Sequence, residues 1–114
     1  MPTGVRDDIG SWINAQPIDE RQRRSLMQEA RARQQSVLVD LKDQACLQQT
    51  SETSIASSNC GASSLPDYAV FSRFAGKIEA MTANTEERAA RYIKYNAARS
   101  GSSTAVPSGD TCGP

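Results

Sequence analysis

The chain has 114 residues, which is room for one small domain. Its 13 basic and 13 acidic residues balance, so it lacks the large excess of positive charge that is typical of nucleic-acid-binding domains. Hydrophobic residues make up 38% of the chain and aromatic residues only 5%, which limits the side chains available for a core.

The N-terminal segment, residues 1–16, carries one apolar stripe. Val5, Ile9, Trp12 and Ile13 fall at positions i, i+4, i+7 and i+8, which is the spacing of one helix face. The segment therefore predicts a short helix or a docking arm. Its start lacks the apolar run of a secretory signal, and the sequence has no run of about 18 apolar residues that would span a membrane. We expect a protein that works in a cytoplasm, or in a virion assembled in one.

The next segment, residues 17–49, predicts a long helix. Pro17 suits the first turn of a helix, and the acids Asp19 and Glu20 are favourable at its positive end. Neither Gly nor Pro occurs in the rest of the segment, and apolar residues recur at helical spacing: Leu26, Ala30, Val37, Leu41 and Ala45.

The segment 50–65 is dominated by small hydroxyl side chains. Eight of the fifteen residues from Thr50 to Ser64 are Ser or Thr. These side chains compete with the backbone for hydrogen bonds, which disfavours both helix and strand. The composition predicts a connecting loop that is either mobile or held by a partner.

A second long helix is predicted over residues 66–99. Its apolar stripe follows at spacings of 3, 4 and 3 residues and consists of Phe71, Phe74, Ile78 and Met81. Asn84 followed by Glu87 resembles a helix cap with its acid three residues later, so a kink or a break is expected near residue 84.

The last segment, residues 100–114, is rich in Ser and Gly and predicts a flexible tail. Together the segments predict an all-α fold. Its centre is an antiparallel helical hairpin over residues 17–99, with a short N-terminal helix, a Ser-rich connecting loop and an irregular C-terminal tail.

The three cysteines, Cys46, Cys60 and Cys112, lie far apart in the sequence. An odd number without a Cys-x-x-Cys pair predicts free thiols in a reducing compartment, with Cys46 buried on a helix face. A bridge between Cys60 and Cys112 is the alternative, because both lie in segments predicted to be flexible.

The sequence offers little for catalysis. It contains no histidine, which is the commonest general base and metal ligand. It also lacks a Gly-rich phosphate loop, a nucleophile elbow and clustered metal ligands. We expect a protein that is not an enzyme, holds no cofactor or metal and takes no small-molecule substrate.

Two groups of residues are candidates for contact with a partner. The first is apolar and forms either a partner interface or the core of a three-helix bundle closed by the N-terminal helix: Trp12, Ile13, Phe71, Phe74, Ile78 and Met81. The second is basic, because an antiparallel hairpin would place the start of its first helix beside the end of its second. This basic end comprises Arg21, Arg24, Arg31, Arg88, Arg91, Tyr92, Lys94 and Tyr95. It would contact phosphates or an acidic protein surface, unless interleaved acids make it an ordinary solvated face.

Two functions follow from these features. A two-helix hairpin buries one stripe per helix, so we expect a core too small to stand alone. The leading hypothesis is a small structural or adaptor subunit of a large assembly, most concretely a virion protein of a phage connector or virion interior. Its partners would be other proteins or copies of itself. The alternative is a regulatory binding module or inhibitor that contacts nucleic acid or an acidic protein surface through the basic end.

Overall fold

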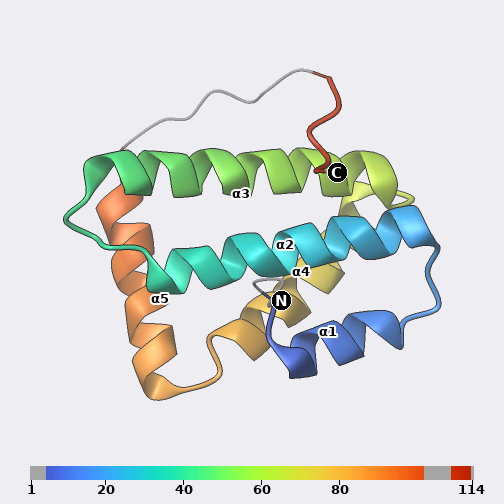
Figure 1. Ribbon diagram of the computed structural model, residues 1–114, viewed down its shortest axis with the longest axis horizontal. Helices are drawn as coiled ribbons and strands as arrows, with labels where there is room; N and C mark the ends of the chain where they lie inside the picture. The colour runs from blue at the N-terminus through green and yellow to red at the C-terminus, as the bar shows by residue number, and fades with distance from the viewer. Residues whose placement is uncertain (1–4, 102–108, 114) are drawn as a thin grey trace.

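The computed structural model describes residues 5–101 and 109–113, and five helices make up most of them (Figure 1). In chain order they are α1 (Asp7–Asn14), α2 (Glu20–Leu38), α3 (Gln44–Ser64), α4 (Tyr68–Thr82) and α5 (Glu86–Arg99). The described residues contain no strand, so the prediction of an all-α fold is confirmed. None of the helices described is long and apolar enough to cross a membrane.

Helix α2 lies at the centre and packs against the other four helices. Helix α3 runs beside it in the opposite direction, and α5 lies at the C-terminal end of α2 (Figure 1). Helices α1 and α4 pack against α2 and against each other. Four helices around α2 therefore replace the helical hairpin with a short N-terminal helix that was expected from the sequence.

Polar side chains fix where four of the helices begin. In each, the side chain of the residue before the helix accepts a hydrogen bond from a backbone N–H in the first turn, which would otherwise lack a partner. The capping residues of α2, α3, α4 and α5 are Asp19, Asp43, Asp67 and Thr85. Asp19 also forms a capping box with Gln22, whose side chain accepts from the backbone N–H of Asp19.

The helix predicted over residues 17–49 is interrupted between Leu38 and Gln44, so that prediction is wrong in its length. The backbone N–H of Lys42 donates to Asp40 Oδ1 at 3.0 Å, and the N–H of Cys46 donates to Asp43 Oδ1 at 3.1 Å. The side chains of Asp40 and Asp43 thus accept hydrogen bonds from backbone N–H groups, which in a continuous helix would donate to backbone carbonyl oxygens instead.

The prediction of a Ser-rich loop over residues 50–65 is also wrong, because nearly all of this segment belongs to α3. Two of its hydroxyls are satisfied within the helix: Thr53 Oγ1 donates to Gln49 O, and Ser63 Oγ donates to Cys60 O, each at 3.0 Å. The small side chains also let α3 approach α2 closely, and Ser57 is fully buried. Tertiary packing therefore outweighs the low helix propensity of Ser and Thr.

The expected break near residue 84 is present. Helix α4 ends at Thr82 and α5 begins at Glu86. The capping residue is Thr85 rather than Asn84, and its hydroxyl accepts from the N–H of Arg88 at 3.1 Å.

The core lies between α1, α2 and α4, with Leu65 beside them. It contains Ile9, Ile13, Leu26, Ala30, Leu65, Phe71, Ala75 and Ile78. Trp12, Phe74 and Met81 are partly buried against this cluster, and the rings of Trp12 and Phe74 meet edge to face with centroids 5.9 Å apart. All six apolar candidates from the sequence thus lie in or against the core. Fully burying an Ile or Phe side chain stabilises the fold by about 1.5–3 kcal/mol.

A polar network joins α2 to α3 and α5. The carboxylate of Glu29, a residue only 3% exposed, accepts from Arg33 Nε at 2.7 Å and from Ser57 Oγ at 2.6 Å. The guanidinium of Arg33 also donates to Tyr92 Oη and lies 3.5 Å from the carboxylate of Glu79. Because a buried carboxylate is costly unless it is paired, this network favours one placement of α3 and α5 on α2.

The predicted tail, residues 100–114, falls partly outside the described residues, which omit 102–108 and 114. Residues 109–113, here called the C-terminal strap, lie over α2 and α3 and are held by a disulfide between Cys60 and Cys112. The prediction that these two cysteines are free thiols is therefore wrong, and the alternative pairing is correct. Cys46 is the free cysteine, and it is exposed rather than buried.

Candidate anion-binding pocket

Helix α2 presents a row of basic side chains on one face. Arg21, Arg24, Gln28 and Arg31 fall at positions i, i+3, i+7 and i+10, so they follow one another along the same side of the helix. Arg21 and Arg24 are exposed and Arg31 is half-buried.

These side chains line a pocket of about 370 Å³ between α2 and the C-terminal strap. Three of its lining residues belong to the strap: Asp110, Cys112 and Gly113. The remaining lining residues come from α2 and α3 and are Arg21, Arg24, Ser25, Met27, Gln28, Arg31 and Cys60. The pocket thus has a helix with three guanidinium groups on one side and a disulfide-linked segment on the other.

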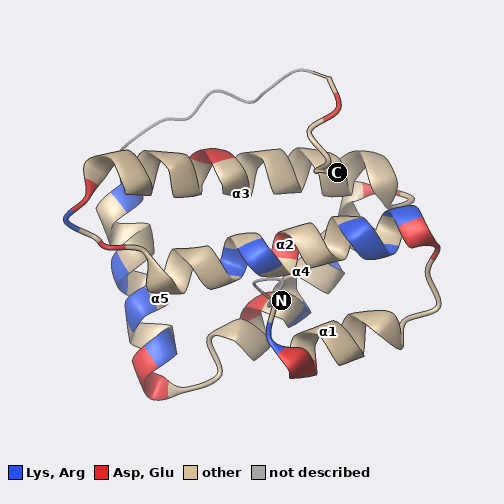
Figure 2. Cartoon of the chain, in the orientation of Figure 1, with Lys and Arg blue, Asp and Glu red and all other residues tan. Residues whose placement is uncertain are grey.

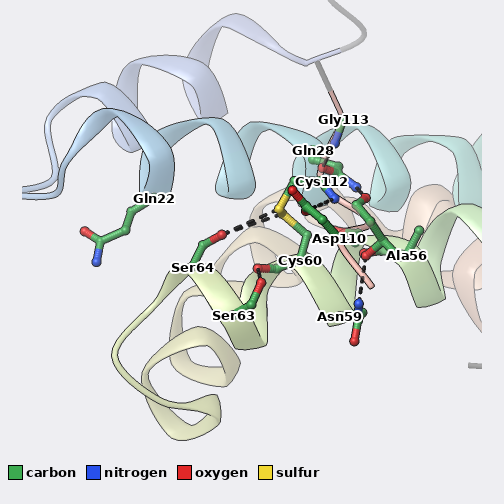
Figure 3. Close-up of a disulfide and its surroundings, with 12 residues drawn as sticks. Gln22, Gln28, Ala56, Asn59, Cys60, Ser63, Ser64, Asp110, Cys112 and Gly113 are labelled. Atoms are coloured by element: carbon green, nitrogen blue, oxygen red, sulfur yellow. Dashed lines mark hydrogen bonds between the residues drawn. A yellow bond between two sulfur atoms is a disulfide. The ribbon is translucent and has the colours of Figure 1, made fainter. Parts of the chain in front are cut away.

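The C-terminal strap is bound to both helices that it crosses (Figure 3). On α2, the side chain of Gln28 donates to Thr111 O at 3.1 Å and accepts from the N–H of Gly113 at 2.9 Å. On α3, Asn59 Nδ2 donates to Gly109 O and to Thr111 Oγ1, both at 3.1 Å. These contacts and the disulfide hold the outer wall of the pocket in place.

The charges in the pocket are not neutralised within the described part of the chain. None of Arg21, Arg24 and Arg31 has an ion-pair or hydrogen-bond partner among those residues. Six other arginines are partnered there: Arg6, Arg23, Arg33, Arg88, Arg91 and Arg99. Three of the four arginines without such a partner therefore gather at one pocket, and the fourth is Arg73 on α4.

A buried hydroxyl group lies at the same place. Ser25 lines the pocket and is 2% exposed, and its Oγ has no hydrogen-bond partner among the residues described. Buried polar groups are nearly always hydrogen-bonded, so such a hydroxyl is an unused donor and acceptor. The Ser25 Oγ is covered by neighbouring atoms, so the donors that the pocket exposes are the guanidinium groups of Arg21, Arg24 and Arg31, which suit the oxygens of a carboxylate or a phosphate.

The structure separates the basic end that the sequence predicts into two places. Arg21, Arg24 and Arg31 lie at the pocket, whereas Arg88 and Arg91 contact the C-terminal end of α2. Val37 lies thirteen positions after Arg24 in the sequence, which is roughly 20 Å along a helix. Figure 2 shows the corresponding basic segments on α2 and on α5. The prediction of a single basic end is wrong, because α5 packs against the end of α2 rather than along its length.

Arg88 and Arg91 serve the fold. Arg88 Nε donates to Thr82 O at 2.6 Å, at the end of α4, and its guanidinium also donates to Gln34. Arg91 Nε donates to Val37 O at 2.5 Å, at the end of α2. Positive groups beside the last carbonyls of a helix stabilise it by about 0.3–1 kcal/mol each.

The other members of the predicted basic end do not reach the pocket. Tyr95 is 6% exposed, and Lys94 lies exposed on α5. Tyr92 accepts from Arg33, and burial raises the pKa of its phenol.

The sequence did not reveal the pocket because its second wall is distant along the chain. The row of Arg21, Arg24, Gln28 and Arg31 is visible as a helical spacing, but nothing in the sequence places residues 109–113 beside it. In the described ranges, 5–101 and 109–113, no group of three or more His, Cys, Asp or Glu side chains could hold a metal ion. No family model, curated protein or solved structure matches this chain.

Proposed function

We propose that this chain is a small binding module that takes an acidic group of a partner protein into the pocket between α2 and the C-terminal strap. One observation carries the proposal: Arg21, Arg24 and Arg31 lie around one pocket without partners among the residues described. Three like charges held near one another repel, and an anion between them removes that repulsion. The role is binding rather than catalysis.

The pocket suits carboxylates on a protein better than a nucleic-acid backbone. Nucleic-acid binding gains most of its strength from many phosphate contacts on a strongly basic surface, whereas this chain has zero net charge and three arginines at one site. A pocket of about 370 Å³ accommodates one or two acidic side chains. Asp110 at the pocket would repel a long polyanion passing over the strap.

The structural or adaptor hypothesis, with a virion protein as its concrete form, is the alternative. This hypothesis rested on the expectation of a core too small to keep the chain folded alone. In the structure, however, α1, α2 and α4 enclose a core around Ile13 and Ile78. Light scattering during size-exclusion chromatography tests it: a stable oligomer would support it, and a monomer at all concentrations would count against it.

The disulfide bears on where the protein works. Disulfides persist in oxidising compartments and are rare in reducing ones. We therefore propose that the bridged form acts in an oxidising compartment or on a virion surface, in place of the cytoplasm expected from the sequence.

The binding proposal is tested with a fluorescein-labelled hexaglutamate peptide and fluorescence anisotropy at low salt. The wild-type protein should bind the peptide, and binding should weaken as salt rises. The double variant Arg24→Gln/Arg31→Gln should lose at least tenfold in affinity. Arg73→Gln is the matched control, because Arg73 is exposed on α4 and lies outside the pocket.

Two outcomes would contradict the proposal. An equal loss of affinity in Arg73→Gln would show that the peptide responds to general charge rather than to the pocket. Tighter binding of a single-stranded DNA hexamer than of the peptide would favour a nucleic-acid partner instead.

A further inference from the structure

The C-terminal strap supplies a wall of the pocket but lacks secondary structure of its own. Residues 109–113 form neither helix nor strand. The strap contributes Asp110, Cys112 and Gly113 to the lining of the pocket. Whatever holds it in place therefore also shapes the pocket.

The disulfide is the strongest of the bonds that hold the strap. The other contacts are hydrogen bonds of Gln28 and Asn59, a bond from Thr111 Oγ1 to Ala56 O at 2.6 Å, and a contact of Ser64 Oγ with Cys112 Sγ at 3.6 Å. Most of these groups are exposed or half-buried, so water competes for them and each contributes little net stability. Ordering the backbone of five residues costs more than such bonds return.

We infer that the pocket is complete only when Cys60 and Cys112 are joined, so that reduction of this disulfide switches off anion binding. This inference rests on the proposed function, because it concerns the same pocket. In the reduced chain the strap leaves α2 and α3, and Arg21, Arg24 and Arg31 become an open row on a helix. Loss of the wall admits water, which raises the effective dielectric constant and weakens each guanidinium–carboxylate contact.

The reductant is a dithiol. Its thiolate attacks Cys112 Sγ, because Cys112 is half-buried whereas Cys60 is 1% exposed. The Cys60–Cys112 bond breaks, and a mixed disulfide forms between the reductant and Cys112 while Cys60 leaves as a thiolate. The second thiol of the reductant then displaces Cys112. Two electrons have passed to the protein, the reductant has become a disulfide, and both cysteines end as thiols after taking up one proton each.

The strap affects peptide binding in two opposite ways: as a wall it should strengthen binding, whereas the negative charge of Asp110 should weaken it. One variant separates these two effects. Asp110 carries a negative charge at the pocket, and its Oδ1 accepts from the N–H of Cys112 at 3.0 Å. In the oxidised protein, Asp110→Asn removes the charge and keeps an acceptor oxygen. We expect Asp110→Asn to tighten peptide binding by a factor of two to five, whereas reduction weakens it.

The experiment uses the full chain with Cys46→Ser, so that the disulfide is the one redox-active group. Affinity for the labelled hexaglutamate peptide is measured in the oxidised form and after reduction with dithiothreitol, and mass spectrometry confirms each state. We expect at least tenfold weaker binding after reduction. Circular dichroism at the assay temperature must show that the reduced chain remains helical.

A second variant tests the strap without breaking the disulfide. Asn59→Ala removes two contacts to the strap from α3 and does not touch the pocket lining. It should weaken peptide binding two- to fivefold in the oxidised form. Gln49→Ala is its matched control, because Gln49 is exposed on the same helix and its side chain has no partner among the described residues.

The outcomes separate this inference from the proposed function. Binding by oxidised protein alone supports both. Equal binding before and after reduction, with Asn59→Ala matching Gln49→Ala, overturns the inference and leaves the proposed function standing. Failure of both forms to bind the peptide overturns the proposed function, and the inference with it.

Discussion

Among single residues, Glu29 is a buried acid whose stability in the fold depends on its hydrogen-bond partners. Its carboxylate is buried between α2 and α3, with Arg33 and Ser57 as partners. We expect Glu29→Ala to lower the free energy of unfolding by about 3 kcal/mol, because it leaves Arg33 and Ser57 without their acceptor in a protected site. Urea unfolding followed by circular dichroism measures the change.

The control for Glu29→Ala is a substitution at Glu79, the second acid beside the guanidinium of Arg33. Glu79 lies 3.5 Å from Arg33, but its side chain is 44% exposed, so its ion pair is screened by water. Glu79→Ala should cost less than about 1 kcal/mol. Equal losses in the two variants would show that burial of the Glu29 pair does not matter.

Cys46 is a residue whose reactivity depends on one neighbour. Its thiol donates to Asp43 Oδ2 at 3.2 Å, and this hydrogen bond, with the negative charge of Asp43, raises the pKa of the thiol. The backbone N–H of Cys46 in turn lowers the pKa of the Asp43 carboxyl. Since the thiolate is the nucleophile, Cys46 should react with iodoacetamide more slowly at pH 8 than a free cysteine does.

The substitution that tests this is Asp43→Asn. Asparagine still caps α3, but it removes the negative charge beside the thiol. The thiol pKa should fall, so the pH profile of alkylation should move to lower pH and the rate at pH 8 should rise several-fold. An unchanged profile, with α3 intact by circular dichroism, would rule out Asp43 as the cause.

At the scale of helices, the contact between α3 and α4 depends on the absence of one side chain. A Cβ atom at Gly61 would lie 2.1 Å from Cδ1 and Cε1 of Phe71, so the ring of this core residue, which is 2% exposed, would have to shift. Gly61→Ala should therefore lower the free energy of unfolding by about 1–3 kcal/mol, although alanine normally favours a helix.

The matched substitution is Gly76→Ala in α4, where a Cβ atom would meet nothing within 4 Å. It should raise the free energy of unfolding by about 0.5–1 kcal/mol. Thermal unfolding followed by circular dichroism should move the two melting temperatures in opposite directions. A rise in both would show that α3 and α4 pack less closely than the structure indicates.

Helix α3 also shows why part of the fold escaped prediction. Hydrophobic periodicity identified the stripes of α1 and α4, because Ile9, Ile13 and Phe71 face an apolar core. The buried residues of α3 are instead mostly small or polar, with Leu47 as the one large apolar side chain, so the helix carries only a weak apolar signal: Leu47, Thr50, Ser57, Cys60 and Gly61. Its stability depends on α2 and on the strap, which lie outside the local sequence.

Across the whole molecule, half of the candidate site was predictable. The arginine row on α2 follows from spacing alone. The wall formed by Asp110, Cys112 and Gly113 does not, because it depends on a disulfide between residues 52 positions apart in the sequence. Such a pairing has no local pattern, so the sequence offered it only as the alternative to free thiols, and the structure decides between the two.

The Cys60–Cys112 disulfide should also set the stability of the whole chain. A cross-link between residues 52 positions apart removes much of the freedom of the unfolded chain. In the chain-entropy treatment, a loop of this size is worth about 4 kcal/mol at 25 °C. That is a large part of the roughly 5–15 kcal/mol that holds a typical domain together.

We therefore expect reduction to lower the free energy of unfolding by up to about 4 kcal/mol, measured by urea unfolding with and without dithiothreitol. The slope against urea should also rise, because the reduced chain exposes more surface when it unfolds. In Cys46→Ser the same loss should appear, since that thiol lies outside the bridge. A change below about 1 kcal/mol would mean that the strap is held as firmly by its hydrogen bonds as by its covalent link. The pocket would then be expected to survive in a reducing compartment.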